Sequence, residues 1–459
     1  MPELPEVETV LRTLEHQIKD QQIENVDIFY EKMIEIDQDS FVSELKGQHF
    51  RKFERRGKYL LFVLDEYTLI VHLRMEGKFY VYPKEYKGKD KHTHVIFYLD
   101  DKQLHYNDVR KFGRMWLYKK DEDYSCLDKL GYEPFDERLT GNYLKKFNKN
   151  NKTKIKTQLL DQSMITGIGN IYADEILFKA SINPLVEARF ICENDYDKII
   201  SATREILKEA IRQGGTTIRS YTSSLGVTGL FQQYLMVHSR DDGTCYKCNS
   251  EIVRVKVNGR STYYCPTCQK ERPITLAITG SIGSGKSTVT KLLAEEGYKT
   301  ISCDEINREL LQKEEVREEL SKILEEPFCK EALSKHIFTN SEQGKTAEKY
   351  LHEMIFKEVS KFIETNNKEI LLVIEVPLLF ESKWDKYFDY NVAVFTPTDK
   401  LYERLEKDRH MSKDQIKERL DKQLLAEEKK QLADYCINND ADLEQLKVNT
   451  KKMIKNILG

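Results

Sequence analysis

The spacing of apolar residues changes several times along the chain, and each change predicts a different kind of structure. Near the start, apolar residues recur every three or four positions, which predicts a helix over residues 6–22. Short β-branched and aromatic runs follow between Gly, Asp, Asn and Lys turns, and they predict a β-sandwich-like or barrel-like domain. The predicted strands are 59–64, 68–73, 78–82, 94–99, 104–107 and 115–118.

The period becomes helical again over residues 141–213, with breaks at 165–171 and at Asn183-Pro184. A helix, a glycine turn and a second helix can hold a phosphate backbone, because loop amides and helix N-termini face the phosphates. A glycine-rich segment, 214–229, leads to a strand-like run at 252–257 and a turn at Asn258-Gly259. This middle part is therefore predicted to be helical and to end in a small β-hairpin.

Beyond residue 273, buried apolar runs alternate with helical segments, which predicts a parallel sheet covered by helices on both faces. Helices are predicted at 289–296 and over the basic segment 404–423. The predicted strands are 274–279, 298–302, 370–376, 391–395 and a run that ends at 437–439.

Length and composition indicate several domains and no membrane span. A chain of 459 residues is expected to form about three domains. Charged residues make up 32% of it, the mean hydropathy is −0.60, and no apolar run approaches the roughly 18 to 20 residues of a membrane helix. Its acidic start lacks the basic-then-apolar order of a signal peptide. We therefore expect a cytoplasmic monomer that does not enter the membrane.

Charge is distributed unevenly. Residues 1–272 carry 43 basic and 41 acidic side chains, whereas the remainder carries 30 and 35. Within the first part, residues 51–272 have a net charge of +10. This excess favours a polyanionic partner for the first part only, although an ordinary solvated surface would account for the charge equally well.

Four of the nine cysteines form two C-x-x-C pairs with 16 residues between them. Thiolates at this spacing are typical of a closed structural zinc site with no open position for chemistry. Two disulfides are the alternative, but the other five cysteines are scattered as reduced thiols would be. The predicted zinc ligands are Cys245, Cys248, Cys265 and Cys268.

Only eleven residues separate the last of these cysteines from a phosphate-binding loop, so a domain boundary is predicted near residues 271–273. Gly280 to Ser287 reads G-x-x-x-x-G-K-S between a predicted strand and a predicted helix. In such a loop Lys286 reaches the β and γ phosphates of ATP and Ser287 binds Mg²⁺. Asp304 follows the next strand, at the sheet edge where ligands bind. The other ATP-binding positions predicted in the loop are Gly283, Ser284, Gly285 and Thr288.

The first 272 residues resemble the formamidopyrimidine-DNA glycosylase family, which repairs oxidised purines in DNA. The resemblance implies a catalytic domain at 1–135, a helix-two-turn-helix DNA-binding domain at 136–238 and a zinc ribbon at 239–272. Leu4 favours oxidised purines, because the related endonuclease VIII group has glycine there. The motifs that carry the resemblance are 2–9 (Pro-Glu-Leu-Pro-Glu-Val-Glu-Thr), 56–60, 72–75, 107–113, 167–172, 214–217 and the cysteine pairs.

The resemblance also implies a mechanism. Removal of Met1 exposes Pro2, whose secondary amine attacks the sugar C1′, expels the base and forms an imine that permits strand scission. Glu3 assists proton transfer at the sugar, Lys58 donates a proton in β-elimination, and Arg260 acts in δ-elimination. If Met1 is retained instead, the chain is expected to be a non-catalytic zinc-dependent DNA-binding protein.

Further positions match the family's DNA contacts. Extrusion of the damaged nucleotide leaves a gap in the duplex that other side chains must fill. By resemblance, the filling residues are Met75, Arg110 and Phe112, the backbone contacts are His92, Lys152 and Asn170, and Glu6 lines the damaged-base pocket. Position alone would instead place Met75 and Phe112 in a core. The sequence departs from the family at Val109, Lys111 and Ser220, which affects substrate preference and not the reaction class.

Residues 274–459 resemble dephospho-coenzyme A kinase, which transfers the ATP γ-phosphate to the 3′-hydroxyl of dephospho-CoA. Besides the loop, the resemblance rests on Asp304, 351–352, the run 376–381, Gln423 and 437–439. It implies a three-layer α/β fold in which Asp304 activates the hydroxyl and Arg404 and Arg409 belong to a lid over ATP.

Three departures from the kinase family bear on its activity. Cys303 replaces one carboxylate of an Asp-Ala-Asp motif, the lid pair is reversed as Asp408-Arg409, and Glu353 replaces a proline. The sequence therefore predicts a glycosylase and AP lyase joined to a CoA-forming kinase, with one structural Zn²⁺ and Mg²⁺-ATP as cofactors. An alternative is a repair glycosylase that carries a degraded, regulatory ATP-binding domain.

Overall fold

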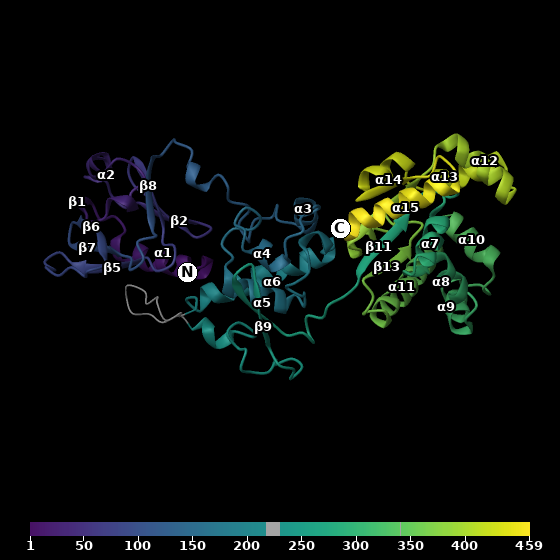
Figure 1. Cartoon of the computed structure of the whole chain (residues 1–459), viewed down its shortest axis with the longest axis horizontal. Coiled ribbons are helices and arrows are strands. Elements are labelled where there is room, and N and C mark those ends of the chain that lie inside the picture. The colour runs from purple at the N-terminus through teal and green to yellow at the C-terminus, as the bar shows by residue number, and fades with distance from the viewer. Residues whose placement is uncertain (217–229, 340) are drawn as a thin grey trace. The chain divides into compact units, whose positions relative to one another are not determined.

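The computed structural model describes residues 1–216, 230–339 and 341–459, and it divides into two compact units (Figure 1). The first unit comprises Met1–Arg189 and Asp195–Lys270, and the second comprises Phe190–Asn194 and Glu271–Gly459. Among the described residues, no helix is both long and apolar enough to cross a membrane.

The first unit opens with two four-stranded antiparallel sheets, ordered β1-β6-β7-β5 and β2-β3-β4-β8. Leu60, Phe62 and Phe97 belong to the buried core that both sheets share, and they are fully inaccessible to solvent. The predicted β-sandwich-like domain is therefore confirmed. Its elements are α1 (Leu4–Ile18), β1 (Ile23–Ile28), α2 (Gln38–Leu45), β2 (Lys52–Arg56), β3 (Tyr59–Val63), β4 (Tyr67–His72), β5 (Lys78–Pro83), β6 (Thr93–Leu99), β7 (Lys102–Asn107) and β8 (Arg114–Lys119).

Strands β1 and β2 and helix α2 were not predicted. Strands β1 and β2 are edge strands, and each buries few side chains because only one neighbour and one face cover it. In β2, Phe53 is the one buried residue among four charged ones, so the alternation is invisible in the sequence. Helix α1 ends at Ile18 instead of residue 22, because Lys19 is extended and Asp20 has a φ of 62°.

The middle of the first unit is helical, with breaks at the predicted turns, and it ends in the predicted hairpin. The hairpin pairs β9 with β10 antiparallel, with Arg260 opposite Val257. The elements are α3 (Gly141–Phe147), α4 (Ile155–Leu159), α5 (Asn170–Lys179), α6 (Glu193–Arg212), β9 (Val253–Val257) and β10 (Arg260–Tyr264). Short 3₁₀ helices in the first unit are η1 (Glu31–Met33), η2 (Ser125–Leu127), η3 (Ala188–Phe190) and η4 (Phe231–Tyr234).

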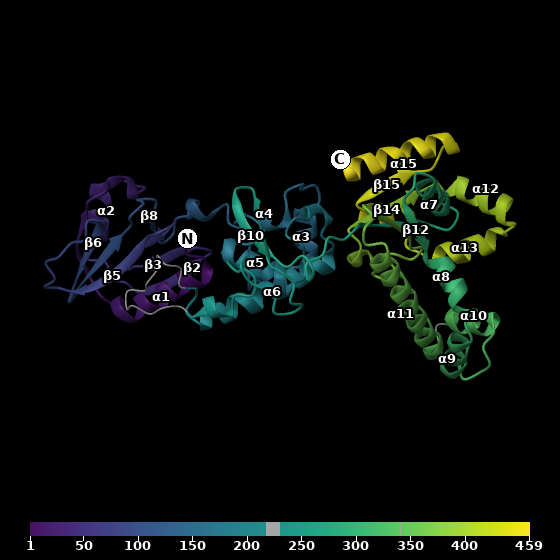
Figure 2. The same ribbon diagram turned by 60° about the horizontal axis from the view of Figure 1, so that its bottom comes forward.

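The second unit is a parallel five-stranded sheet ordered β12-β13-β11-β14-β15. Figure 2 shows α7 and α15 on one face of the sheet and α8 and α11 on the other. The predicted three-layer α/β fold is thus confirmed. Its strands are β11 (Ile274–Thr279), β12 (Lys299–Ser302), β13 (Leu371–Glu375), β14 (Tyr390–Phe395) and β15 (Tyr435–Asn438).

The basic segment predicted as one helix over 404–423 is two helices. His410 has a φ of 52°, which ends the first helix, and the Ser412 side chain caps the second. The helices of this unit are α7 (Lys286–Glu295), α8 (Cys303–Leu310), α9 (Glu314–Leu324), α10 (Lys330–Phe338), α11 (Glu342–Thr365), α12 (Thr398–Arg409), α13 (Lys413–Asp421), α14 (Ala426–Leu432) and α15 (Leu443–Leu458), with the 3₁₀ helix η5 (Asp385–Tyr387).

Candidate functional sites

The start of α1 meets the N-terminus of α5, and this junction holds Glu3. The Glu3 carboxylate accepts N–H groups from Gly169 at 2.6 Å and Ile171 at 3.0 Å, two of the amide donors exposed at a helix start. Gly169 has to be glycine because a Cβ there would overlap the Glu3 side chain. Burial raises the pKa of Glu3, and Lys58 opposes that rise. The turn before α5 therefore fixes a buried carboxylate beside the start of the chain.

Lys58 lies in the same place, in the two-residue turn between β2 and β3. Its Nζ donates to the backbone oxygen of Ile168 at 2.7 Å. Burial lowers the pKa of Lys58 to about 8, Glu3 and Glu6 act against this, and the Arg260 charge adds to it. Burial likewise lowers the pKa of the Met1 amino group. The charges of Glu3 and Glu6 raise this pKa, and the charge of Lys58 lowers it further. Glu3 and Lys58 thus lie near the amino group at the start of the chain, and Arg260 lies near Lys58.

Glu6 is held by four hydrogen bonds. Its carboxylate accepts from the Tyr172 hydroxyl at 2.8 Å, from the N–H and hydroxyl of Thr216 at 2.7 and 3.0 Å, and from the Glu3 N–H at 2.9 Å. Glu6 therefore links α1 to α5 and to Thr216, the third residue of the Gly-Gly-Thr-Thr motif at 214–217. Residues 217–229, including Thr217 and Ser220 of the sequence analysis, lie outside the described residues.

The loop after β7 presents two of the predicted gap-filling residues to solvent. Asp108 is buried and accepts N–H groups from Arg110, Phe112 and Gly113 at 2.8 to 2.9 Å. Arg110 is exposed, and its guanidinium lies 4.7 Å from the Phe112 ring centroid. Phe112 is 45% exposed, so the alternative that it is a core residue is wrong. Met75 is half-buried and is not part of the buried core either.

The three predicted backbone-contact residues are placed differently. Lys152 is exposed and His92 is half-buried, in the segment before β6. Asn170 begins α5 and donates from Nδ2 to the Ser261 backbone oxygen at 3.0 Å. Lys156 donates to the same oxygen at 3.0 Å and to Asp174 at 2.6 Å. Asn170 and Lys156 therefore also attach the β9–β10 hairpin, which carries Arg260, to α5.

The four predicted zinc ligands converge. Their Sγ atoms lie within 4.8 Å of one another, and the Cys245–Cys268 and Cys248–Cys265 separations are 3.8 and 3.4 Å. Tetrahedral Zn–S bonds of about 2.3 Å require sulfurs about 3.8 Å apart, so the donor set fits Zn²⁺. Backbone N–H groups of Lys247 and Cys268 also point at Cys245 and Cys265 sulfurs, which favours thiolates. Four ligands from two turns leave no position for substrate.

In the second unit, the loop between β11 and α7 curls around the Lys286 side chain. The Lys286 Nζ donates to the backbone oxygens of Gly280 and Ser281 at 3.0 and 3.1 Å. Gly285 has a φ of 96°, a conformation that disfavours any residue with a Cβ, and α7 begins directly after it. The Asn439 side chain holds the loop by donating to the Ser284 oxygen at 2.8 Å. The loop is therefore shaped for a phosphate before α7 begins.

Glu375, at the carboxyl end of β13, is a site residue that the sequence analysis did not single out. It is buried, and Ser287 Oγ donates to its Oε1 at 2.8 Å. Ser302 pairs with Glu375 across β12 and β13, so the carboxylate lies next to Cys303 and Asp304. The signal in the sequence is a carboxylate at the end of a buried apolar strand, but the sequence does not show that this strand lies beside the phosphate loop. Hydroxyl and carboxylate oxygens are suitable Mg²⁺ ligands, so Ser287 and Glu375 fit that ion.

These residues line one cavity of about 980 Å³. Asp304 begins α8 at its wall, and Cys303 beside it is buried, which raises the pKa of its thiol to about 12. Cys303 does not replace the missing carboxylate chemically, but Glu375 places a second carboxylate in the cavity. Lys286, Ser287 and Arg409 also face it.

The two predicted lid arginines have different surroundings. Arg409 ends α12 and lines the cavity despite the reversed Asp-Arg order. Arg404 lies one turn earlier and donates to the Thr396 hydroxyl at 3.3 Å and to the Asn439 oxygen at 3.1 Å. Because Thr396 and Asn439 both donate to the Ser284 oxygen, Arg404 supports the phosphate loop. Arg419 of α13, which was not predicted, also lines the cavity.

Family models match nearly all of the chain. The formamidopyrimidine-DNA glycosylase N-terminal domain matches residues 1–115, its H2TH domain matches 130–222, and a zinc finger found in FPG and IleRS matches 244–270. The dephospho-CoA kinase model matches residues 274–445. Both resemblances drawn from the sequence are confirmed.

Individual proteins match the first part at high identity. Formamidopyrimidine-DNA glycosylases of Exiguobacterium sibiricum and Oceanobacillus iheyensis are 46% and 44% identical over 275 and 277 residues, which is 59% of this chain and 99% of each relative. Among solved structures, a Lactococcus lactis FPG mutant bound to Fapy-dG-containing DNA is 39% identical, with a TM-score of 0.56. It aligns over its whole length with 59% of this chain. The Lactococcus lactis complex with abasic-site DNA has a TM-score of 0.55 at 38% identity, over 58% of this chain and 99% of that one.

Proposed function

Because the chain belongs to the formamidopyrimidine-DNA glycosylase family over its first part and continues into a dephospho-CoA kinase domain, we propose that both halves are working enzymes in one polypeptide. The first excises oxidised purines from duplex DNA and cleaves the strand, and the second phosphorylates dephospho-CoA with ATP. The proposal places both in the cytoplasm.

One observation supports the proposed repair activity most directly. Glu3 and Lys58 are buried together, and the charges of both shift the pKa of the amino group at the start of the chain. We propose that removal of Met1 leaves Pro2 as the nucleophile. Its nitrogen bonds to C1′ as the bond to the base breaks, and the base leaves with the electron pair and takes up a proton. The amine then loses its own proton, and the C1′–O4′ bond of the sugar opens with the ring oxygen taking up a proton, which leaves a double bond between the nitrogen and C1′. The resulting imine acidifies the C2′ proton, so elimination of the 3′ phosphate can follow.

Assigned roles for the surrounding residues follow from their places. Glu3 moves protons at the sugar because it is the carboxylate fixed beside the amine, and Lys58, with its lowered pKa, can give up a proton near neutral pH. Arg260, which the β9–β10 hairpin carries, acts in δ-elimination. Arg110 and Phe112 fill the gap left by the extruded nucleotide, because Asp108 holds their loop outward. Met75, Glu6, His92, Lys152 and Asn170 keep their proposed DNA contacts.

The kinase half rests on the shared cavity in which Lys286, Asp304, Glu375 and Arg409 meet. Asp304 orients the ribose hydroxyl and takes its proton, and Lys286 and Arg409 offset charge on the transferred phosphoryl group. Mg²⁺, held by Ser287 and Glu375 when bound with ATP, would neutralise the β and γ phosphate oxygens. Although one carboxylate of the family's Asp-Ala-Asp motif is replaced, the cavity keeps Lys286, Asp304 and Glu375, which disfavours the regulatory alternative.

Borohydride trapping tests the repair half. Duplex DNA with 8-oxoguanine opposite cytosine should form a covalent adduct with the full chain, and Pro2→Gly should weaken it. Intact mass should show that Met1 is absent. A free Pro2 with no adduct would mean that this half only binds DNA.

CoA formation tests the kinase half in the same preparation. Dephospho-CoA, ATP and Mg²⁺ should give CoA at a rate within roughly 1 to 100 s⁻¹. Asp304→Asn should abolish most of this turnover and leave adduct formation intact. Turnover that is unchanged in Asp304→Asn would refute the assigned base.

A further inference from the structure

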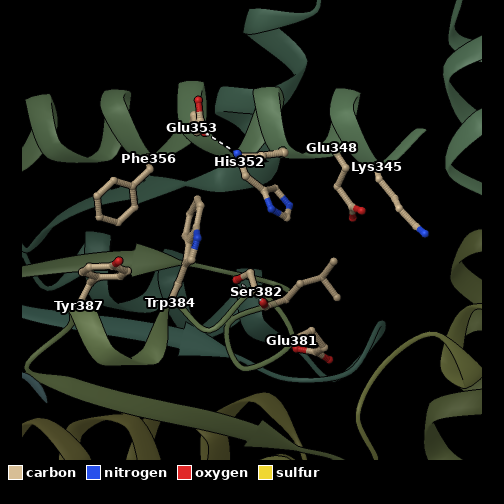
Figure 3. A pocket seen from close by; sticks show the side chains of 11 residues that line it. Lys345, Glu348, His352, Glu353, Phe356, Glu381, Ser382, Trp384 and Tyr387 are labelled. Atoms are coloured by element: carbon tan, nitrogen blue, oxygen red, sulfur yellow. Dashed lines mark hydrogen bonds and ion pairs between the residues drawn. The ribbon is translucent and has the colours of Figure 1, made fainter. Parts of the chain in front are cut away.

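A fully buried lysine of the kinase unit takes no part in the mechanism proposed above. The side chain of Lys429 in α14 is 1% exposed, and its Nζ lies 2.8 Å from the Glu381 carboxylate. Figure 3 shows Glu381 on the segment that follows β13, across a cavity from His352 and Glu348 of α11. Charges are costly to bury even as a pair, so this ion pair calls for an explanation.

The same carboxylate also holds the chain just before α14. Glu381 Oε1 accepts the Leu424 N–H at 2.9 Å, in the connection between α13 and α14. The adjacent Gln423 side chain accepts the N–H of Ile282 in the phosphate loop at 3.1 Å. This connection is therefore attached both to the segment after β13 and to the loop that is shaped for phosphate.

The helices that precede this connection carry two of the cavity's arginines. We call α12 and α13 the lid helices, and they bring Arg409 and Arg419 to the cavity that contains Lys286. Apolar residues of both lid helices pack with Ile282 of the phosphate loop in one small cluster. Because α13 ends at Asp421, the hydrogen bonds to Gln423 and Leu424 determine where the lid helices join the rest of the unit.

Lys429 also contributes charge to the phosphate site. Burial is the main cause of the lowered pKa of Lys286, and the charge of Lys429 lowers it further. Arg409 acts in the same direction, and Glu375 and Asp304 act against both. Lys429 is not among the described residues that line the cavity, so its charge acts from behind the lining. A second fixed cation therefore supports the place where the ATP phosphates would bind.

We propose that the Glu381–Lys429 pair positions the base of the lid helices against the phosphate loop and thereby supports ATP binding, an inference that rests on the proposed kinase function. Lys429 is a positioning residue and not a catalytic one, because it acts through Glu381 and through the field at Lys286. Loss of the pair should therefore weaken the binding of ATP and leave the binding of the acceptor nearly unchanged.

Titration of the full-length chain with a fluorescent ATP analogue tests this without requiring turnover. Lys429→Met keeps a side chain of similar length and removes its charge, so the dissociation constant should rise about tenfold. Lys429→Arg keeps the charge and should restore most of the affinity. Lys430→Met removes an exposed lysine from the next position of α14 and is the matched control. Equally weak binding by the Lys429→Met and Lys429→Arg variants would overturn the proposal.

A double variant guards against misfolding. Removing one member of a buried ion pair leaves the other charge uncompensated, whereas replacing both members is often neutral for stability. Lys429→Met combined with Glu381→Gln removes both charges and keeps a side-chain oxygen for the Leu424 N–H. It should fold, as circular dichroism would show, and bind the ATP analogue as weakly as Lys429→Met. Wild-type affinity in the double variant would refute the proposal.

Steady-state kinetics separate the positioning of ATP from a general loosening of the kinase unit. In the double variant, KM for ATP should rise about tenfold, and KM for dephospho-CoA should change by less than about twofold. Equal increases in both constants would mean that the pair only maintains the fold, which would overturn the proposal. A wild-type chain that makes no CoA would instead refute the kinase function, and the titration would still decide the role of the pair.

Discussion

Two buried lysines, Lys58 and Lys286, have a pKa of about 8, one in each proposed active site. In both cases burial is the largest cause, and it outweighs the neighbouring carboxylates, chiefly Glu3 for Lys58 and Glu375 for Lys286. Each lysine is therefore mostly protonated at neutral pH but loses its charge just above it. In the proposed mechanisms, the same physical effect serves proton donation by Lys58 in one site and phosphate binding by Lys286 in the other.

ATP affinity should consequently depend on pH. Below pH 8 Lys286 is already charged, so affinity should be nearly constant. Above pH 8 binding must first protonate Lys286, so the dissociation constant should rise, approaching about tenfold per pH unit. Titration with a fluorescent ATP analogue from pH 7 to 9.5 measures this.

Lys286→Arg is the matched control for that titration, because an arginine stays charged over the whole range. Its dissociation constant should be higher at neutral pH, because the fork geometry differs, but should not rise with pH. The same pH dependence in both proteins would contradict the assignment to Lys286.

Glu375→Gln should keep the shape of the site and remove a charge that holds Mg²⁺. We expect kcat for CoA formation to fall about 100-fold, as for the loss of one electrostatic group in other enzymes, and the Mg²⁺ concentration for half-maximal rate to rise. Steady-state assays over a Mg²⁺ series check both. Glu369→Gln, an exposed carboxylate just before β13, should change neither, and an unaltered Mg²⁺ response in Glu375→Gln would exclude the role.

At the scale of elements, the repair site depends on how the zinc ribbon is attached to α5. Ser261 of β10 accepts hydrogen bonds from Asn170 and Lys156, and His238 Nδ1 lies 2.7 Å from Asp174. The buried Glu175 carboxylate accepts N–H groups from Met236, Val237 and His238 at 2.8 to 3.0 Å. These contacts position a small hairpin whose buried cluster is shared with Phe178 of α5 and includes the metal ligands Cys245 and Cys265, so the metal must help to fold it.

Zinc removal should therefore inactivate one half of the chain only. Cys245→Ser, or treatment with a strong chelator, should unfold the hairpin, displace Arg260 and weaken duplex binding more than about tenfold, because zinc binding supplies the folding free energy of such modules. Fluorescence anisotropy with labelled duplex measures binding, and CoA formation in the same sample should be unchanged. Cys329→Ser, an exposed cysteine of the second unit, is the control. Loss of both activities on zinc removal would argue against separate units.

At the scale of the whole molecule, two units with different folds and charges occupy one chain. Residues 1–272 have a net charge of +2 and the rest −5. Arg272, which the sequence analysis assigned to the ribbon, forms a two-pronged ion pair with the buried Asp389 beside the kinase sheet, at 2.5 and 2.6 Å. The kinase unit thus includes residues upstream of its first strand.

The two activities should be independent. CoA formation by the full chain should have the same kcat and KM with and without saturating duplex that contains 8-oxoguanine, since the substrates share no chemistry. An undamaged duplex at the same concentration is the control for non-specific charge effects. A lesion-dependent change in kinase rate would instead favour the alternative in which ATP binding regulates repair.

Much of the fold and of both sites could be predicted from local pattern. The cysteine spacing, the G-x-x-x-x-G-K-S loop after an apolar run, and the motifs around Glu3, Lys58 and Arg110 all consist of residues close in sequence. Buried strands such as β11 and β13 were predicted because both their faces are apolar. The edge strands β1 and β2 were not predicted from the sequence. They are strands because they pair with β6 and β3, and this pairing leaves no pattern in their own residues.

The sequence by itself determined which chemistry the chain carries, since the proposed nucleophile, the four thiolates and the phosphate loop are set by residue type and short spacing. Only the tertiary structure decided which distant residues complete each site. It brought Glu375 of β13 to Ser287, attached Glu3 to the N-terminus of α5, turned Phe112 to solvent and moved Arg404 behind the phosphate loop. The hydrogen bonds among these contacts join residues separated by 35 to 166 positions, and the exposure of Phe112 depends on burial. Side-chain packing decides both, because no local periodicity in the sequence encodes how two elements approach each other.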